Sequence, residues 1–344
     1  MKVIFSEAQK KHYPENFLSS GARQPIPEVP ERADRLLAAA LSAGLARSEP
    51  DDFGDAPLAT VHTPEYLQFL QHIYTRWQRI PDASKEVMPN VHPARRGVAY
   101  PLSAVGQVGY HVYDSACPIS ADTWDSARWS AMTAVQGAHE LLRGDDACYA
   151  LARPPGHHAA RDLAGGFCYL NNSAIGAEVL RSRFARVAIL DVDVHHGNGT
   201  QEIFYDRPDV LTVSIHADPM RFYPFFWGHA AERGEGAGLG ANYNLPLPRG
   251  TKDDGYLQAL DRALARIHAF SPGALVVALG LDAFEGDQFQ GLAVTTEGFG
   301  RIAERIAALQ LPTLLVQEGG YLSDELGANL ASFLQGFLGN HQPP

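Results

Sequence analysis

The chain has 344 residues and a formal net charge of −11 at pH 7, and hydrophobic residues make up 45% of it. This composition supports a large apolar core, and no run of about 18 apolar residues predicts a transmembrane helix. An acidic surface disfavours nucleic acids and anionic membranes as partners, and it attracts small cationic ligands instead.

The first half of the chain predicts one strand, two helices and an irregular segment. The strand is expected over Lys2 to Ser6, where the apolar run is too short for a signal peptide, and the proline-rich residues 7–30 are expected to form a loop. Helices are expected over residues 31–43 and from Thr63 onward, where threonine followed by proline is a typical helix start. Residues 81–123 contain prolines, glycines and aromatic residues, which indicates a lid or an interface.

From about residue 126 onward, helical and strand patterns alternate. Helices are expected near 126–142, 172–183, 253–270, 297–308 and 324–338, and strands near 148–152, 187–190, 210–215, 275–281 and 313–317. This alternation predicts an α/β fold with a doubly wound, mostly parallel sheet and helices on both faces. Because no repeat or change in composition marks a boundary, residues 1–344 are expected to form a single domain.

The cysteines indicate the compartment. Cys117, Cys148 and Cys168 are scattered along the chain and form no C-x-x-C pair. Such a set is typical of reduced thiols, so we expect a cytoplasmic protein.

Polar residues follow four of the expected strands, at the edge where open α/β sheets bind ligands. The central strand leads into Asp191, Asp193 and His195, which would share one face of an extended strand because they are spaced two apart. Asp282 follows another strand. This placement predicts a three-ligand site of the kind that catalytic zinc commonly occupies, formed by Asp193, His195 and Asp282. Asp191 remains an alternative to Asp193, because spacing alone does not separate the two.

A tandem histidine pair, His157 and His158, follows another strand. An enzyme that activates water at a metal needs a base to take a proton and an acid to protonate the leaving group, and such a pair can supply both. Asp191 and Asn198 are the natural partners for the second ring nitrogens. Tyr321 follows two glycines and could donate to an oxyanion, although Gly-Gly-Tyr alone indicates a buried structural tyrosine more strongly.

Five motifs resemble the zinc-dependent deacetylases of the arginase–histone deacetylase superfamily and occur in the same order. They are Arg153-Pro-Pro-Gly-His-His-Ala159, Gly165-Gly-Phe-Cys-Tyr-Leu-Asn-Asn172, Leu190-Asp-Val-Asp-Val-His-His-Gly-Asn-Gly-Thr-Gln201, Leu279-Gly-Leu-Asp282 and Glu318-Gly-Gly-Tyr321. Within that superfamily, the start Met1-Lys-Val-Ile-Phe-Ser-Glu7 and the segments Gly106-Gln-Val-Gly-Tyr110 and Pro118-Ile-Ser-x-x-Thr-Trp124 resemble bacterial acetylpolyamine amidohydrolases.

The resemblance implies a role for each matching residue. It implies a metal, zinc or ferrous iron, on Asp193, His195 and Asp282, a general base at His158 beside His157, partners for the pair at Asp191 and Asn198, and a carbonyl-polarising Tyr321. It also implies an acyl-lysine channel lined by Gly166, Phe167 and Tyr223, and a structural potassium ion near Asp191, Asp193, His195 and Ser214. Residues 81–123 correspond to an insertion that forms a homodimer interface and narrows the entrance.

Two departures from the family pattern bear on the chemistry. Asn198 stands where some members have aspartate, which should leave His158 less basic. Val105 and Ala116 stand where some acetylpolyamine enzymes have glutamates, so only Asp114 or Asp122 remain as possible ammonium partners. We therefore expect broad specificity for acetylated polyamines.

The sequence thus predicts a zinc-dependent amidohydrolase that removes acetyl groups from small cationic acetylated polyamines. The first alternative is a protein acetyl-lysine deacylase of the histone deacetylase type, which would use the same centre. A two-manganese ureohydrolase of the arginase type would need further aspartate ligands. The last alternative is a non-catalytic binding protein, but every catalytic position is present, which argues against it.

Overall fold

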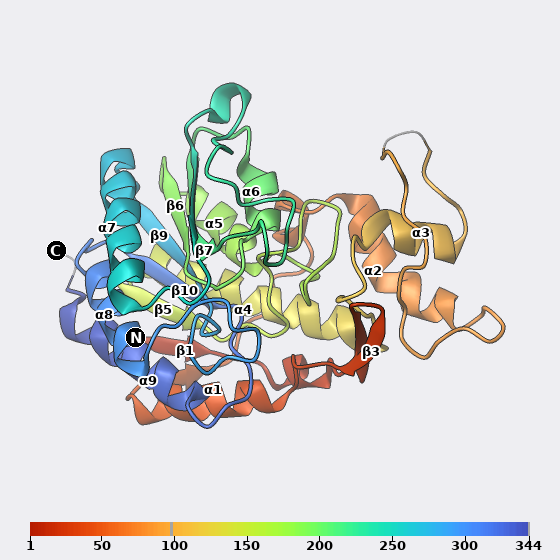
Figure 1. Ribbon diagram of the computed structural model, residues 1–344, viewed down its shortest axis with the longest axis horizontal. Helices are drawn as coiled ribbons and strands as arrows, with labels where there is room; N and C mark the ends of the chain where they lie inside the picture. The colour runs from red at the N-terminus through yellow and green to blue at the C-terminus, as the bar shows by residue number, and fades with distance from the viewer. Residues whose placement is uncertain (97–98, 343–344) are drawn as a thin grey trace.

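A computed structural model describes residues 1–96 and 99–342 of the chain. Its centre is an eight-stranded sheet in the order β4-β1-β5-β10-β9-β6-β7-β8, and each neighbouring pair is parallel (Figure 1). The strands are β1 (Lys2–Ile4), β4 (Ala46–Ser48), β5 (Ala147–Ala150), β6 (Val187–Asp191), β7 (Val210–Ala217), β8 (Asn242–Leu247), β9 (Ala274–Leu279) and β10 (Thr313–Gln317). The expected doubly wound parallel sheet is confirmed.

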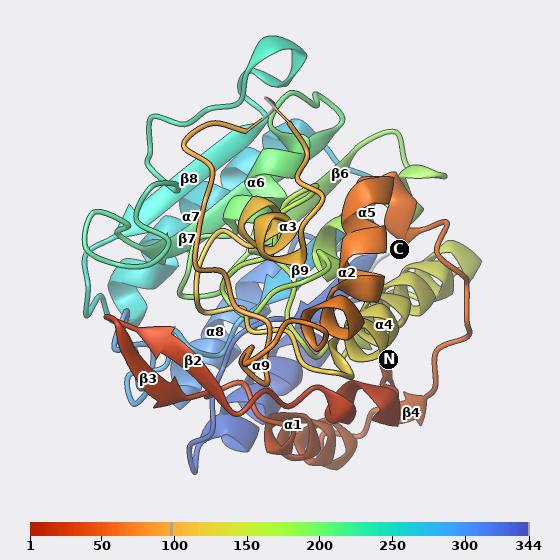
Figure 2. The ribbon, with the colours of Figure 1, turned by 90° about the vertical axis from the view of Figure 1, so that its right-hand side faces the viewer.

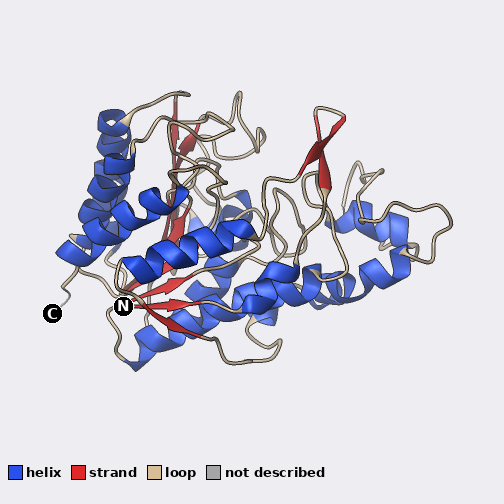
Figure 3. Ribbon diagram, turned by 90° about the horizontal axis from the view of Figure 1, so that it is seen from below, coloured by secondary structure: helices blue, strands red, loops and turns tan. Residues whose placement is uncertain are grey.

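Helices cover both faces of this sheet, as the view from below in Figure 3 shows. They are α1 (Glu31–Ser42), α2 (Pro64–Trp77), α3 (Ala104–His111), α4 (Thr123–Arg143), α5 (Asn172–Arg181), α6 (Asn198–Phe204), α7 (Asp253–Phe270), α8 (Thr296–Ala307) and α9 (Leu326–Asn340), with short 3₁₀ turns η1 (Glu7–Lys11), η2 (Leu58–Thr60) and η3 (Gly236–Gly238). In the part of the chain that the structure describes, none of these helices has the length and apolar character needed to cross a membrane.

Successive side chains of the central strands enter two different apolar layers. On β9, Leu275 and Val277 pack in the layer that α1, α7, α8 and α9 cover, whereas Val276 packs in the layer under α2, α4 and α5. All six residues of β9 are buried. A strand enclosed on both faces needs apolar side chains on both, which explains the continuous apolar run in its sequence.

The expected loop over residues 7–30 contains a hairpin, so that expectation was wrong. Strands β2 (Asn16–Ser19) and β3 (Ala22–Pro25) pair antiparallel, apart from the main sheet. The turn between them, Ser20-Gly21, has positive φ at both residues, the backbone of a tight hairpin. Pro25 is the last residue of β3, and in the described structure this two-stranded sheet has no third strand that would need a hydrogen bond from its missing N–H.

The irregular segment 81–123 is more ordered than its composition predicts, although residues 97–98 within it lie outside the described part. It contains α3, whose first turn is capped by Ser103, and a backbone pairing between Val87 and Ile119. Figure 2 shows α3 on the side that faces the viewer, close to α2. Helix α6 and strand β8, which the sequence patterns did not predict, lie further along the chain.

Candidate active site

Four adjacent strands bring the predicted site residues to one edge of the sheet. β5, β10, β9 and β6 are neighbours in that order, and each ends shortly before a polar motif. The loop after β5 contains the histidine pair, the loop after β6 runs from Asp191 to Asn198, Asp282 follows β9, and Tyr321 follows β10. All strands are parallel, so these loops converge at the carboxyl edge.

Asp193, His195 and Asp282 form a buried cluster. One possible ligand atom from each lies within 4.8 Å of the others. His195 Nδ1 is 3.1 Å from Asp193 Oδ1 and 3.3 Å from Asp282 Oδ2. Among the described residues, Asp282 Oδ2 has no hydrogen-bond partner although it is buried. Two close carboxylates and an unsatisfied oxygen are what a divalent cation would satisfy, so the residues fit a metal.

Backbone groups hold the outer oxygens of the two carboxylates. Val194 N donates to Asp282 Oδ1 at 3.1 Å, and Gly319 N donates to Asp193 Oδ2 at 2.8 Å. A Cβ on Gly319 would lie 2.1 Å from Asp282 Oδ2, so only glycine allows this backbone to approach. The remaining oxygens are left to face the cluster.

Asp191 lies elsewhere, and the expectation that Asp191, Asp193 and His195 share one face of a strand was wrong. β6 ends at Asp191, and the chain then turns. Asp193 N bonds Asp191 Oδ1 at 3.1 Å and His195 N bonds Asp193 Oδ1 at 2.8 Å, so the carboxylates themselves stabilise the turn. The structure therefore groups Asp193, and not Asp191, with the other two residues.

The histidine pair has two different partners. His157 Nδ1 is 2.9 Å from Asp191 Oδ2, and His158 Nδ1 is 2.7 Å from Asn198 Oδ1. Burial opposes a charge on both rings, but the carboxylates around His157 raise its pKa well above the usual value. Burial and the nearby histidines lower the pKa of His158 well below the usual value. The surroundings thus favour the charged form of His157 and the neutral form of His158.

Tyr321 lies on a loop that buried arginine contacts hold in place. Arg32 donates to the carbonyl oxygens of Glu318, at 2.8 Å, and Gly320, and its guanidinium lies 5.1 Å from the centre of the Tyr321 ring. Glu28 balances the charge of Arg32 at 2.6 Å. Sequence reasoning missed this pair. The signal was a charged i, i+4 pair beside the apolar face of α1.

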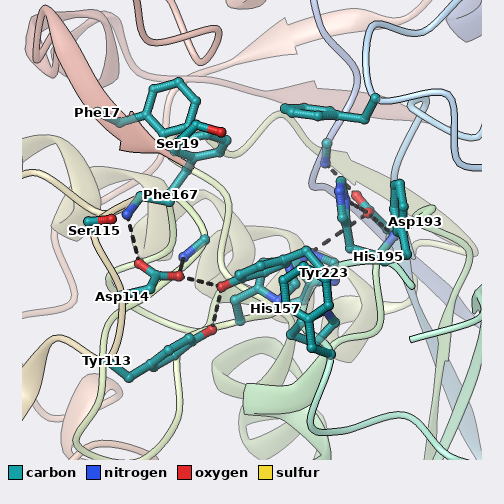
Figure 4. A pocket seen from close by; sticks show the side chains of 18 of the residues that line it. Phe17, Ser19, Tyr113, Asp114, Ser115, His157, Phe167, Asp193, His195 and Tyr223 are labelled. Carbon is teal, nitrogen blue, oxygen red and sulfur yellow. Dashed lines mark hydrogen bonds and ion pairs between the residues drawn. The ribbon is translucent and has the colours of Figure 1, made fainter. Parts of the chain in front are cut away.

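A cavity of about 560 Å³ leads to the cluster. Gly166, Phe167 and Tyr223 line it, as the resemblance implied for a channel, and Asp193 and His195 lie at one end (Figure 4). Phe167 has φ +66°, a left-handed backbone that bulky residues rarely adopt, and its N–H donates to Ala116 O at 3.3 Å. Strained backbone of this kind concentrates at functional sites.

The cavity contains more positive charge than the sequence suggested. Asp114 lines it and is partly buried, whereas Asp122 precedes α4 outside its lining. Arg221 and Arg249 also line the cavity, and both are exposed. Ala116 lies in the lining where a glutamate would add negative charge. The local charge therefore differs from the overall value of −11.

Ser214 lies beside Asp191, on the neighbouring strand. The two residues are Cα partners in the β6–β7 register. Ser214 is buried, and its Oγ is 2.7 Å from His216 Nδ1. Of the residues implied for a potassium ion, Ser214 and Asp191 are therefore neighbours, whereas Asp193 and His195 belong to the cluster with Asp282.

Comparison with known proteins gives consistent matches. A model of the histone deacetylase domain matches residues 26–337. The chain is 49% identical to acetylpolyamine amidohydrolase from Burkholderia pseudomallei, with 98% of each covered, and 43% identical to acetylpolyamine amidohydrolase 1 from Pseudomonas aeruginosa, with 98% of this chain and 99% of that protein covered. A crystal structure of acetylpolyamine aminohydrolase from Burkholderia pseudomallei superposes with a TM-score of 0.97 and 48% identity, covering 99% of this chain and 100% of the other.

Proposed function

The chain belongs to the histone deacetylase family, and on that premise we propose that it hydrolyses the acetamide of small acetylated polyamines, releasing acetate and the free amine. One observation supports this most directly. The clustered Asp193, His195 and Asp282 lie at the end of an aromatic cavity, beside a histidine pair and a tyrosine. Chains similar over nearly their whole length are acetylpolyamine amidohydrolases.

Asp193, His195 and Asp282 would hold one divalent cation, which we propose is zinc. Bound there, such an ion supplies Lewis acidity and makes water acidic enough to ionise near neutral pH. His158 is the base in this proposal, because its surroundings favour the neutral ring and its Nδ1 is already bonded to Asn198. The proton that it removes from the attacking water goes to Nε2.

His157 and Tyr321 complete the proposed chemistry. His157, kept positive by Asp191, stabilises negative charge developing nearby and is the proton source for the departing amine. The Tyr321 hydroxyl, which bonds no described protein group, donates to the oxygen of the acetamide as that oxygen becomes negative. The contacts of Arg32 hold that tyrosine in place before substrate arrives.

The cavity walls favour a thin, flexible substrate. Phe167 and Tyr223 present aromatic faces that suit a methylene chain and, further out, an ammonium group. Apart from Asp193 of the cluster, the carboxylate in the lining is the partly buried Asp114, which accepts a hydrogen bond from Tyr223 and forms no ion pair with an arginine among the described residues. Arg221 and Arg249 would repel a second distant ammonium. Acetylated diamines should therefore outperform acetylated triamines and tetramines, which narrows the broad specificity expected from the sequence.

Four further assignments belong to this proposal. The domain spans residues 1–344, with residues 81–123 as an insertion that narrows the entrance. That insertion joins two copies into a homodimer. A potassium ion binds near Asp191, Asp193, His195 and Ser214. The enzyme works in the cytoplasm, in keeping with three buried free cysteines.

A substrate panel tests the proposal. The zinc-loaded protein is assayed with acetylputrescine, acetylcadaverine, acetylspermidine, acetylspermine and an acetyl-lysine peptide, and kcat/KM is compared. We expect the two acetylated diamines to exceed the peptide by at least about tenfold, which is about 1.4 kcal/mol in transition-state terms. A peptide preferred by that factor would identify a protein deacylase instead.

A further inference from the structure

A chain of hydrogen bonds connects Asp114 to His158 across the cavity wall. Tyr223 Oη is 2.6 Å from Asp114 Oδ2, and Tyr113 Oη is 2.9 Å from Tyr223 Oη (Figure 4). Asn198 Nδ2 is 3.3 Å from Tyr113 Oη, and Asn198 Oδ1 is 2.7 Å from His158 Nδ1. Two tyrosines and an amide thus link a carboxylate to the proposed base.

The direction of this chain follows from the carboxylate at its end. An ionised carboxylate can only accept, so Tyr223 donates to Asp114. Tyr223 then has lone pairs left for Tyr113, which donates to it. Tyr113 in turn has only lone pairs left for Asn198, so the amide must present its NH₂ group to Tyr113. Its oxygen is therefore the atom that faces His158.

The amide orientation decides which nitrogen of His158 has the proton. An amide oxygen facing Nδ1 requires Nδ1–H and leaves Nε2 as the acceptor that a base needs. An amide rotated by 180° would present NH₂ to Nδ1, which would place the proton on Nε2 and remove the acceptor. An aspartate at this position would have two acceptor oxygens, and rotation would change nothing.

We propose that Tyr113, Tyr223 and Asp114 are positioning residues that hold the Asn198 amide in the one orientation that keeps His158 a base. The inference rests on the proposed function. It explains why asparagine can replace aspartate as the partner of His158. An aspartate presents an acceptor oxygen to His158 in either orientation, whereas an asparagine does so in only one, and the tyrosines fix that orientation. Asp114 is itself held by the N–H groups of Ala116 and Gly166, each at 3.0 Å.

A double-mutant cycle tests this assignment. The variants are Tyr113→Phe, Asn198→Asp and the double variant, each assayed with acetylputrescine after zinc loading. Partners of this kind typically contribute about 10–100-fold. We expect Tyr113→Phe to lower kcat by about tenfold while KM stays within about twofold of the wild-type value. In the Asn198→Asp background, we expect the same substitution to lower kcat by less than about twofold.

Tyr66→Phe is the matched control. It removes the hydroxyl of a buried tyrosine, which donates to Tyr169 O at 2.6 Å outside the cavity lining. It should lower the melting temperature and leave kcat unchanged. If Tyr113→Phe fails to fold, Tyr223→Phe breaks the same chain one link further out and should show the same dependence on residue 198.

A spectroscopic measurement separates this inference from the proposed function. In zinc-loaded protein with ¹⁵N-labelled histidine, the wild type should show His158 protonated at Nδ1, and Tyr113→Phe should show a mixture of tautomers. Wild-type protein inactive on every acetylated amine would refute the proposed function while leaving this measurement valid. An unchanged tautomer, or an equal kcat loss in both residue-198 backgrounds, would overturn the positioning role.

Discussion

Removal of the metal should destabilise the wild-type protein, and Asp282→Asn should abolish that response. Asparagine keeps the shape of Asp282 and can still accept from Val194 N through Oδ1. It replaces the one buried oxygen of the cluster that has no hydrogen-bond partner in the described structure. The variant therefore loses a metal ligand while keeping the contact that holds the loop.

The size of the effect follows from linkage. A ligand present at about 1,000 times its dissociation constant stabilises the folded state by about 4.1 kcal/mol. An unfolding entropy of about 2.1 cal/mol/K per residue over 344 residues gives about 0.7 kcal/mol/K. Chelation should therefore lower the wild-type melting temperature by about 6 °C. The fold should survive, because Asp193 and Asp282, acting against burial, raise the pKa of His195 to about 9, so that a proton partly replaces the cation.

Calorimetry with and without EDTA, together with metal analysis by mass spectrometry, measures this response. Asp287→Asn is the matched control, because Asp287 is another buried carboxylate of the same loop that accepts from Phe289 N and lies outside the cluster. The Asp287→Asn protein should keep one equivalent of zinc, and EDTA should lower its melting temperature as much as it lowers that of the wild type. An Asp282→Asn protein that retains stoichiometric zinc would refute the ligand set, and so would a wild type indifferent to EDTA.

Three further predictions follow. Tyr321→Phe should lower turnover of acetylputrescine about 10²–10³-fold while zinc content is unchanged; activity within a few-fold of wild type would remove Tyr321 from the mechanism. Light scattering at micromolar concentration should give twice the 37.4 kDa mass of one chain; a fully active monomer would contradict an interface at residues 81–123. Hydrogen bonds from Arg207 and then Arg181 hold the pKa of Asp209 well below its usual value. Its contribution is therefore fully present at neutral pH, begins to decrease as pH falls below about 3.9, and is lost as pH falls through the depressed pKa of the folded state. In urea unfolding, Asp209→Asn should be less stable by about 1 kcal/mol at pH 7, and this deficit should decrease steadily as pH falls below about 3.9; a deficit that does not decrease over that range would contradict this cause.

Local patterns were sufficient to predict six of the eight strands of the sheet, all except β4 and β8, and the polar motifs at its edge. The periodicity of apolar residues within each strand and helix depends on neighbours a few positions away, so it can be recognised in the sequence. Parallel strands then place the loops after β5, β6, β9 and β10 at one edge without further information. That is why His157, Asp193 and Asp282, although far apart in the sequence, could be expected together.

Three features depended on the tertiary structure. The turn after β6 directs Asp191 to His157 and Asp193 to the cluster, although spacing alone treated the two carboxylates as equivalent. Arg32 contacts the Tyr321 loop from a helix 286 positions earlier in the chain. Tyr113 meets Tyr223 across 110 positions. Contacts at such separations depend on how complete elements pack, and residue periodicity contains no information about which distant side chains that packing brings within hydrogen-bond distance.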